Sequence, residues 1–282
     1  MTIIFDGIAS GMLLFLISVG LSVTLGLMNF INLAHGAFAM VGGYVCVILL
    51  DRLGVPFFAG VVIAALAAAA FGAVLERLLY RRLYGSSALD QVLFSIGLVF
   101  VAMAVAHWLF GPAQQPVRIP GWLQGQINLP GADIGIYRAF LVVLGAVVAL
   151  GLHGIIGVTR FGAELRASVD NPRVARGMGI DVDKVFVLTF AIGSGLAGLG
   201  GAVGANLLGL DPGFPLRYLV YFLIVVSVGG AGSITGSLVA ALIIGICDVA
   251  GKYYLPDLGA FIIYTVMVVM LIVRPQGLFG TR

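Results

Sequence analysis

The chain has 282 residues, of which 61% are hydrophobic and only 10% charged. Because an ordinary soluble domain is about a quarter charged, this composition excludes a soluble globular protein and indicates one that crosses a lipid bilayer several times. The net charge of +3 is distributed unevenly among the loops, as membrane topology requires, so it calls for no nucleic-acid partner.

Nine apolar segments follow one another along the chain. A helix needs roughly 20 apolar residues to cross a bilayer, and the uncharged runs here are too long for barrel strands. In the last third, the glycines of "GGAGSITG" fit either two short spans or a broken, re-entrant helix. The sequence therefore predicts a single all-α, polytopic membrane domain over residues 1–282, with about 8–9 transmembrane helices. The predicted spans lie near residues 8–27, 30–50, 54–75, 90–110, 138–158, 185–207, 216–230, 233–251 and 257–273.

Basic residues divide the predicted loops into two sides. Ten of the fifteen Lys and Arg residues fall on one side, among them Arg81, Arg173 and Arg274. The positive-inside rule assigns this side to the cytoplasm. The other five are spread over four outer loops, of which the longest, 111–137, contains Trp122. With nine spans, the N-terminus is expected outside and the C-terminus inside.

Polar residues interrupt the second predicted span, in the stretch "GLMNFINLAHGAFAMVGGYV". On a helical wheel, Asn29, Asn32 and Gly36 share one narrow stripe, and His35 lies beside it. The stripe either packs against a neighbouring helix or lines a water-accessible path, and for His35 alone packing is favoured. Asn and Gly together also predict that the helix unwinds near these residues, which gives a broken, glycine-rich second helix.

Two other spans carry small or polar residues at membrane depth. Gln91 and Ser95 in the fourth span, and Asn206 at the outer end of the sixth, are weaker candidates for the translocation path. The sixth span also has small residues at every fourth position, which predicts a ridge for close packing against another helix. These residues are Gly193, Ala197, Gly201 and Ala205.

The long cytoplasmic loop, "TRFGAELRASVDNPRVARGMGIDVDK" at 159–184, predicts one short helix. Asn171 suits the N-cap, Pro172 the first helical position, and Gly177 or Gly179 the end. Such a segment is either an amphipathic linker on the anionic inner leaflet or a docking element for a soluble partner. Its apolar side is formed by Val174, Ala175 and Met178, and its basic side by Arg173 and Arg176.

Three motifs together carry a resemblance to a known family. "GLMNFINLAHGAFAMVGGYV", "LRASVDNPRVARGMGID" and "GGAGSITGSLVAAL", in this order, resemble the permease subunits of branched-chain amino-acid ABC importers, specifically the H-type permeases of LIV systems. The similarity runs over nearly the whole chain. It implies the ABC importer permease fold and a multi-pass location in the bacterial inner (cytoplasmic) membrane.

The resemblance also implies partners and cargo. In the family, the permease forms a heterodimer with a second, homologous permease, receives substrate from a periplasmic substrate-binding protein and docks on two ATP-binding ABC subunits. Those subunits bind the ATP, and this chain has no Walker A sequence GxxxxGK[ST], so no cofactor of its own is expected. The implied cargo is a branched-chain or other aliphatic amino acid. Close relatives handle urea or short amides, which are therefore the alternative.

Carried onto this sequence, the resemblance assigns two groups of residues. The first group, Asn29, Asn32, His35 and Gly36, lies on the span nearest the translocation path. The side of the short helix that contains Ala175 is expected to be buried in the ATPase, so that the ATPase moves the membrane helices. The ATPase-coupling loop, about 159–184, contains Arg166, Ala167, Asn171, Pro172, Ala175, Gly179 and Ile180.

Two other function classes remain open from the residues. A proton-coupled secondary carrier would need an intramembrane carboxylate or histidine, and the spans offer almost none besides His35 and Asp248, which can pair with Lys252 at i, i+4. An enzyme is disfavoured because the sequence has no HExxH or GxSxG motif and no paired carboxylates at membrane depth. No catalytic residue and no metal site is predicted.

Overall fold

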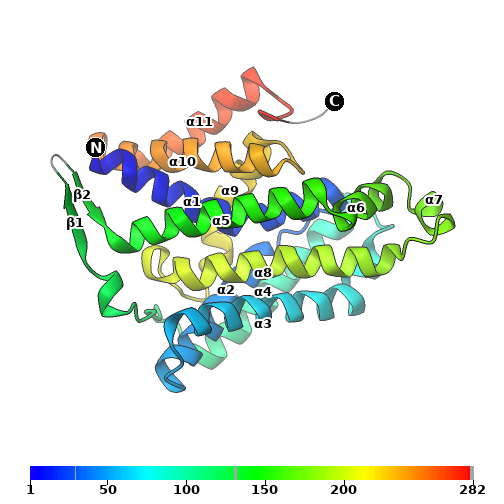
Figure 1. Ribbon diagram of the computed structural model, residues 1–282, viewed down its shortest axis with the longest axis horizontal. Coiled ribbons are helices and arrows are strands. Elements are labelled where there is room, and N and C mark those ends of the chain that lie inside the picture. The colour runs from blue at the N-terminus through cyan, green and yellow to red at the C-terminus, as the bar shows by residue number, and fades with distance from the viewer. Residues whose placement is uncertain (29, 130–131, 280–282) are drawn as a thin grey trace.

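The computed structural model describes residues 1–28, 30–129 and 132–279, and it is almost entirely helical (Figure 1). A two-stranded antiparallel hairpin, β1 (Gln126–Leu129) and β2 (Ala132–Gly135), precedes the fifth helix and pairs Gln126 with Gly135. The helices are α1 (Thr2–Met28), α2 (His35–Val47), α3 (Phe57–Leu78), α4 (Ala88–Phe110), α5 (Ile136–Val158), α6 (Arg160–Asp170), α7 (Pro172–Gly177), α8 (Val182–Leu208), α9 (Phe214–Gly229), α10 (Ile234–Tyr254) and α11 (Gly259–Val273). Short irregular turns are η1 (Ile48–Arg52), η2 (Tyr80–Leu83) and η3 (Gly121–Leu123).

Seven helical segments in the described part of the chain are long and apolar enough to cross a membrane. Two further apolar helices, Phe214–Gly229 and Phe261–Val273, are shorter. The nine predicted segments therefore all form helices, and the prediction of an all-α, multi-pass membrane protein is confirmed. In the ambiguous last third, Gly230 adopts a left-handed conformation (φ +93) and Ser233 caps the next helix, so α9 and α10 are separate helices.

The second helix starts later than a continuous span would. Residues 33–34 form a turn, α2 begins at His35, and the chain passes into the π-helical turn η1 at Ile48. The side chain of Asn32 accepts a hydrogen bond from the backbone N–H of Ala34 at 3.1 Å. Because Asn side chains compete with the helical backbone for such donors, they favour a turn just before a helix.

The core of the bundle is built around α1, which is apolar on all sides and packs against α8 and α10. Close packing depends on glycines: a Cβ at Gly201 would collide with the carbonyl of Ala39 in α2, and one at Gly245 with the backbone of Gly11 in α1. The predicted packing role is confirmed for Gly201, whose missing side chain lets α8 and α2 approach backbone to backbone.

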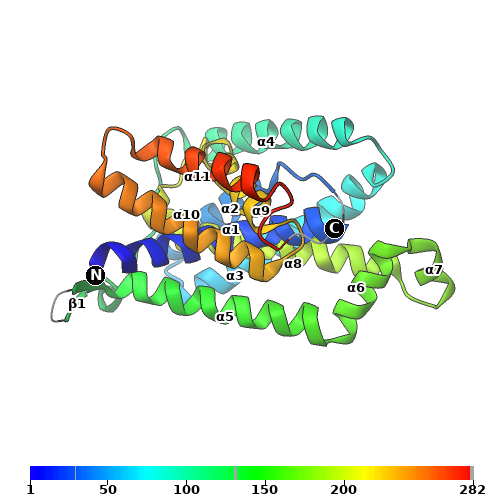
Figure 2. The ribbon, with the colours of Figure 1, turned by 90° about the horizontal axis from the view of Figure 1, so that it is seen from above.

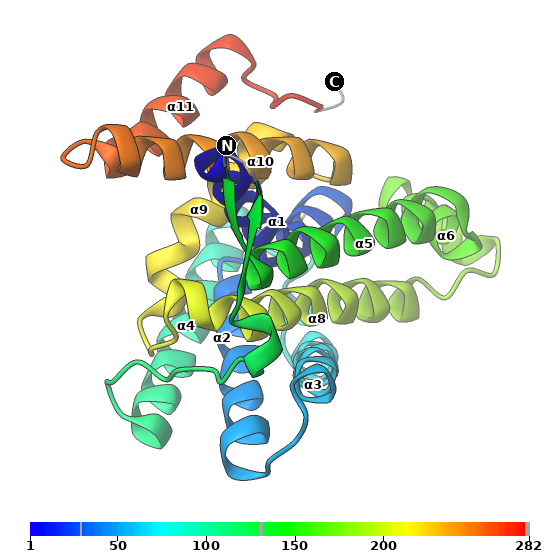
Figure 3. The same cartoon turned by 60° about the vertical axis from the view of Figure 1, so that its left-hand side comes forward.

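The long helices run between two ends of the molecule, which we call outer and inner. Figure 1 places the N-terminus and the β-hairpin at the outer end and α6 and α7 at the inner end. Figure 2 shows α4 and α5 on opposite sides of the bundle, with α1, α2 and α9 between them. In Figures 1 and 3, α9 crosses between α8 and α10 at a steep angle to the long helices. The inner end thus collects the turns after α1 and α3 and the connection from α5 to α8.

Candidate functional site

At the inner end, the segment before α2 is held by side chains from two other elements. Asn32 is buried, and its Oδ1 accepts a hydrogen bond from the hydroxyl of Tyr80 in η2 at 3.0 Å, besides the bond from Ala34. Phe30 packs edge-on against Tyr80, with ring centroids 5.2 Å apart. The start of α2 is therefore fixed to η2 by one buried hydrogen bond and one aromatic contact.

The fourth helix holds the same segment through Gln91. Its Oε1 accepts from the N–H of Ile31 at 3.1 Å, and its Nε2 donates to the carbonyl of Leu83 at 3.2 Å. Ser95, one turn further along α4, is fully buried and donates to the carbonyl of Val92. The structure thus brings Asn32 and Gln91 to one place, although they lie about sixty residues apart in the sequence. Asn29 lies outside the described residues.

His35 and Gly36 are packed inside the bundle. His35 is 1% exposed, and its Nε2 lies 2.7 Å from the carbonyl oxygen of Ile17 in α1. A Cβ on Gly36 would lie 3.0 Å from the backbone of Pro215 and 3.2 Å from the ring of Phe222, so a larger side chain there would displace α9. Within this chain both residues pack against neighbouring helices, which is the role that the sequence favours for His35. Their place on the translocation path stays a prediction.

Asn206 is separate from the other path candidates. It lies at the outer end of α8, where it donates to the carbonyl of Val117 at 3.3 Å and lines a cavity of about 740 Å³ beside the hairpin. Arg118 and Arg138 line the same cavity. Six of the seven candidate residues therefore fall into three places, and Asn29 is not placed. The inner group is Asn32, Gln91 and Ser95, the buried pair on α2 is His35 and Gly36, and the outer residue is Asn206.

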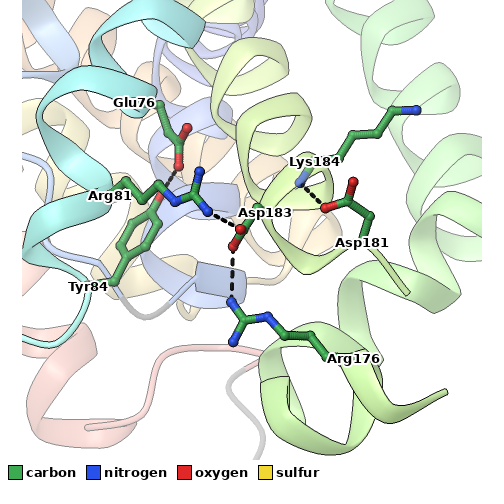
Figure 4. A network of polar contacts seen from close by, with 7 residues as sticks. All are labelled: Glu76, Arg81, Tyr84, Arg176, Asp181, Asp183 and Lys184. Atoms are coloured by element: carbon green, nitrogen blue, oxygen red, sulfur yellow. Dashed lines mark hydrogen bonds and ion pairs between the residues drawn. The ribbon is translucent and has the colours of Figure 1, made fainter. Parts of the chain in front are cut away.

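Hydropathy does not reveal the polar network at the inner end (Figure 4). Glu76, near the end of α3, is 1% exposed, and its Oε1 accepts from the hydroxyl of Tyr84 at 2.7 Å. Burial raises the pKa of the Tyr84 hydroxyl, and the bond to Glu76 raises it further, so Tyr84 stays a donor. The expectation of almost no carboxylate in the spans misses Glu76, because it lies one residue beyond the predicted span.

Asp183 connects the same region to the long inner loop. Its carboxylate pairs with Arg81 of η2 and, at 3.0 Å, with Arg176 of α7 (Figure 4). The loops that contain Arg81 and Arg176 therefore lie on the same side of the bundle, as the charge pattern predicts. Because the inner loop also contains Glu164, Asp170 and Asp181, the sequence alone does not show which carboxylate makes this contact.

The loop between α5 and α8 contains two helices, of which the sequence predicted one. As expected, Asn171 caps α7 by accepting from Val174 N–H at 3.1 Å, Pro172 is its first residue and Gly177 its last. The helix missed is α6, which is capped by Thr159 and turns back toward α5. Arg166 in α6 donates to the carbonyl of Ile156 at 2.6 Å, which fixes α6 against the end of α5.

The apolar residues of α7 do not form one side. Ala175 is 2% exposed, and its carbonyl accepts from Ile180 N–H at 3.1 Å, so its side chain is buried in this chain's own loop. Val174 and Met178 are 56% and 79% exposed. The Ala175 side chain itself is therefore not free to contact a partner, contrary to expectation, and docking of this side of the helix on the ATPase stays a prediction. The free apolar surface of α7, as we use the term, is formed by Val174 and by Met178, the C-cap residue that follows the helix.

Within residues 1–28, 30–129 and 132–279, no group of three or more His, Cys, Asp or Glu residues is arranged to hold a metal ion.

Comparison with known proteins points to one family. The family model described as "Branched-chain amino acid transport system / permease component" matches residues 3–271.

Individual relatives cover nearly the whole chain. The high-affinity branched-chain amino acid transport system permease protein BraD of Pseudomonas aeruginosa is 30% identical, over 98% of this chain and 94% of the relative. The corresponding LivH of Escherichia coli is 28% identical over 98% and 94%. A probable LivH of Methanocaldococcus jannaschii is 27% identical over 95% and 89%. The chain is thus similar throughout its length to proteins of bacteria and of Methanocaldococcus.

One solved structure has a similar fold. PsaBC from Streptococcus pneumoniae, in complex with Fab, superposes with a TM-score of 0.51 over 97% of this chain and 92% of that chain. The identity of 14% limits this likeness to the arrangement of the helices.

Proposed function

Since the chain belongs to the family of permease components of branched-chain amino acid transport systems, we propose that it is the membrane-spanning permease subunit of an ABC importer. It moves branched-chain or other aliphatic amino acids across the bacterial inner membrane. Its partners are a second, homologous permease, two ATP-binding subunits and a periplasmic substrate-binding protein. The named relatives, BraD and LivH, are permease proteins for branched-chain amino acids, which supports this cargo over urea or short amides.

The observation that carries the coupling part of this proposal is the shape of the inner loop. The coupling segment, which we define as α6 and α7, projects from the inner end of the bundle (Figure 1). It is fixed to the membrane helices by Arg166 and Arg176 and presents Val174 and Met178 to solvent. An exposed apolar pair on a firmly attached short helix fits a docking element for the ATPase better than a mobile linker.

The substrate path is proposed to run beside the start of α2. Asn32 and Gln91 close the inner end there, and because both are buried in this single chain, a path must open by movement of the segment they hold or at the contact with the second permease. Polar side chains at such depth are costly unless they serve packing or transport. Asn206 is proposed to lie at the outer entry, where the cavity beside the hairpin opens.

The test uses two matched variants in the complete complex. Met178→Glu places a charge on the free apolar surface of α7, whereas Ile127→Glu places the same charge on β1, where Ile127 is 46% exposed at the outer end. If α7 docks on the ATPase, co-purification of the ATPase and substrate-stimulated ATP hydrolysis fall for Met178→Glu and stay unchanged for Ile127→Glu. Wild-type behaviour of both variants would assign α7 to the membrane surface instead.

Cargo is tested separately in proteoliposomes. Uptake of labelled leucine that depends on the binding protein and on ATP, and that persists when an uncoupler dissipates the proton gradient, is expected. Uptake of labelled urea in place of leucine would support the alternative cargo. Loss of leucine uptake on uncoupling while ATP is maintained would instead support a proton-coupled carrier.

A further inference from the structure

The short turn η2 makes polar contacts on two sides at the inner end of the bundle. On one side, Tyr80 donates to Asn32, and the carbonyl of Leu83 accepts from Gln91, which itself holds Ile31. On the other side, Arg81 pairs with Asp183. Asp183 in turn pairs with Arg176 of α7, so two ion pairs connect α7 to η2. From η2, one hydrogen bond leads through Tyr80 and two lead through Leu83 and Gln91 to the segment before α2.

The contacts on the two sides of η2 differ in burial. Tyr80 is completely buried, and so is the Asn32 that it holds. Asp183 is 39% exposed at its side chain, and its partners Arg81 and Arg176 are 49% and 56% exposed. An exposed ion pair contributes little to folding, whereas a buried hydrogen bond between two fixed groups holds their relative position.

We propose that η2 transmits movement of α7 to the segment before α2. The positioning residues are Asp183 of α8, which joins α7 to η2, and Tyr80 of η2, which joins η2 to Asn32. This inference rests on the proposed function, because only an ATPase docked on α7 supplies the movement. Asp183 links α7 to η2 through two arginines, and Tyr80 links η2 to Asn32 at the inner end of the proposed path. A displacement of α7 can therefore reach Asn32 through these polar contacts, of which the last, between Tyr80 and Asn32, lies inside the buried core.

The negative charge of Asp183 could also act only locally, by stabilising the start of α8. It lies in the first turn of α8, where a negative charge is favourable because of the helix dipole. Asp181, two residues earlier, caps the same helix by accepting from the N–H of Lys184 at 3.1 Å and forms no ion pair within the described residues. Asp181→Asn keeps a capping oxygen and removes the same charge, so it is the matched control for Asp183→Asn.

The experiment measures leucine transported per ATP hydrolysed by the reconstituted complex. Asp183→Asn is expected to lower this ratio by about 2- to 30-fold, the range found for residues that carry coupling, while the ATPase still co-purifies and hydrolyses ATP. Asp183→Glu, which keeps the carboxylate, should restore most of the ratio. Asp181→Asn should leave it unchanged.

The buried end of η2 is tested by Tyr80→Phe, which removes only the hydroxyl that donates to Asn32. The control is Tyr218→Phe, which removes a hydroxyl donated to the carbonyl of Leu208 at the outer end. Tyr80→Phe should lower transport per ATP, and Tyr218→Phe should not. If Asp183→Asn and Tyr80→Phe both keep the wild-type ratio, the inference is overturned.

The two levels of the proposal fail in different ways. If Met178→Glu leaves ATPase binding and hydrolysis intact, docking through α7 fails, whatever Asp183 does. If Met178→Glu releases the ATPase but Asp183→Asn transports normally, docking stands and transmission through η2 fails. Equal losses in Asp183→Asn and Asp181→Asn would also reject the inference, since they would reflect the charge at the start of α8 alone.

Discussion

Basic residues at the outer end of the bundle are mostly paired with their own aspartates, whereas most basic residues at the inner end are not. At the outer end each pair has one cation and one aspartate, and the pairs are Arg118 with Asp51, Arg138 with Asp6, Arg217 with Asp211 and Lys252 with Asp248. At the inner end Arg81 and Arg176 share Asp183. The other inner basic side chains form no ion pair within the part of the chain that the structure describes.

The paired aspartates at the two ends also differ in how far their side chains are exposed. Asp211 and Asp248 are each 9% exposed at the side chain, against 39% for Asp183. By sequence, the outer loops carry five basic and six acidic residues, and the inner loops ten and six. Four of the five outer basic residues are thus paired with carboxylates that are less exposed than Asp183. Most inner basic residues, in contrast, stay available to an anionic lipid leaflet or a partner protein.

The largest effect is expected when the two ends are labelled from outside the cell. In a variant without Cys46 and Cys247, a cysteine at Trp122 should react fully with an impermeant thiol reagent, and one at Arg173 should not react until the membrane is permeabilised. The control is a cysteine at Arg81, which should behave like the one at Arg173. Reaction of position 173 in intact cells would reverse the assignment of inner and outer ends.

Removal of a buried outer carboxylate is expected to destabilise the protein most among the ion-pair variants. Asp211 accepts from Gly213 N–H at 2.8 Å and pairs with Arg217 at 2.7 Å, so Asp211→Ala loses both contacts. The expected cost is about 2 kcal/mol, because a partly buried backbone donor is left unsatisfied while the half-exposed Arg217 is rehydrated. Thermal unfolding in detergent measures it, and Asp211→Asn, which keeps the acceptor, should cost less.

A smaller loss of unfolding free energy is expected when Lys252, the cation of the predicted i, i+4 pair, is replaced. Lys252 lies 2.7 Å from Asp248, which confirms the pairing expected from sequence. Lys252→Met leaves the buried carboxylate without its partner and should cost about 1 kcal/mol in the same unfolding assay. Lys184→Met, at the inner end, is the control and should change stability by less than about 0.5 kcal/mol. Equal shifts for the two variants would contradict the contrast between the ends.

The smallest effect on stability is expected for the inner aspartate. Asp183→Asn breaks two ion pairs, yet all three side chains are well exposed, so the unfolding free energy should fall by no more than about 0.5 kcal/mol. Its effect should instead be seen in transport per ATP. A stability loss as large as that of Asp211→Ala would show that the inner pairs are structural and would remove the contrast.

Much of the molecule could be predicted because the signals are local. Spans depend on runs of about 20 apolar residues, which composition shows directly. The start of α7 depends on Asn171 and Pro172, and the Lys252 pair depends on a spacing of four, so each is contained within a few residues of sequence. Membership of the permease family follows from motifs that the chain carries in order.

Other features were decided only when the helices packed. The start of α2 at His35 depends on Tyr80 and Gln91, the burial of Ala175 on the fold of its own loop, and the pairing of Arg81 with Asp183 on a contact between residues 102 positions apart. Hydropathy and helix periodicity describe each segment alone, whereas these contacts depend on which segments meet and at what depth. The sequence by itself therefore determined that the chain is a permease with its basic loops on one side, and the tertiary structure decided which residues join those loops to the buried start of α2.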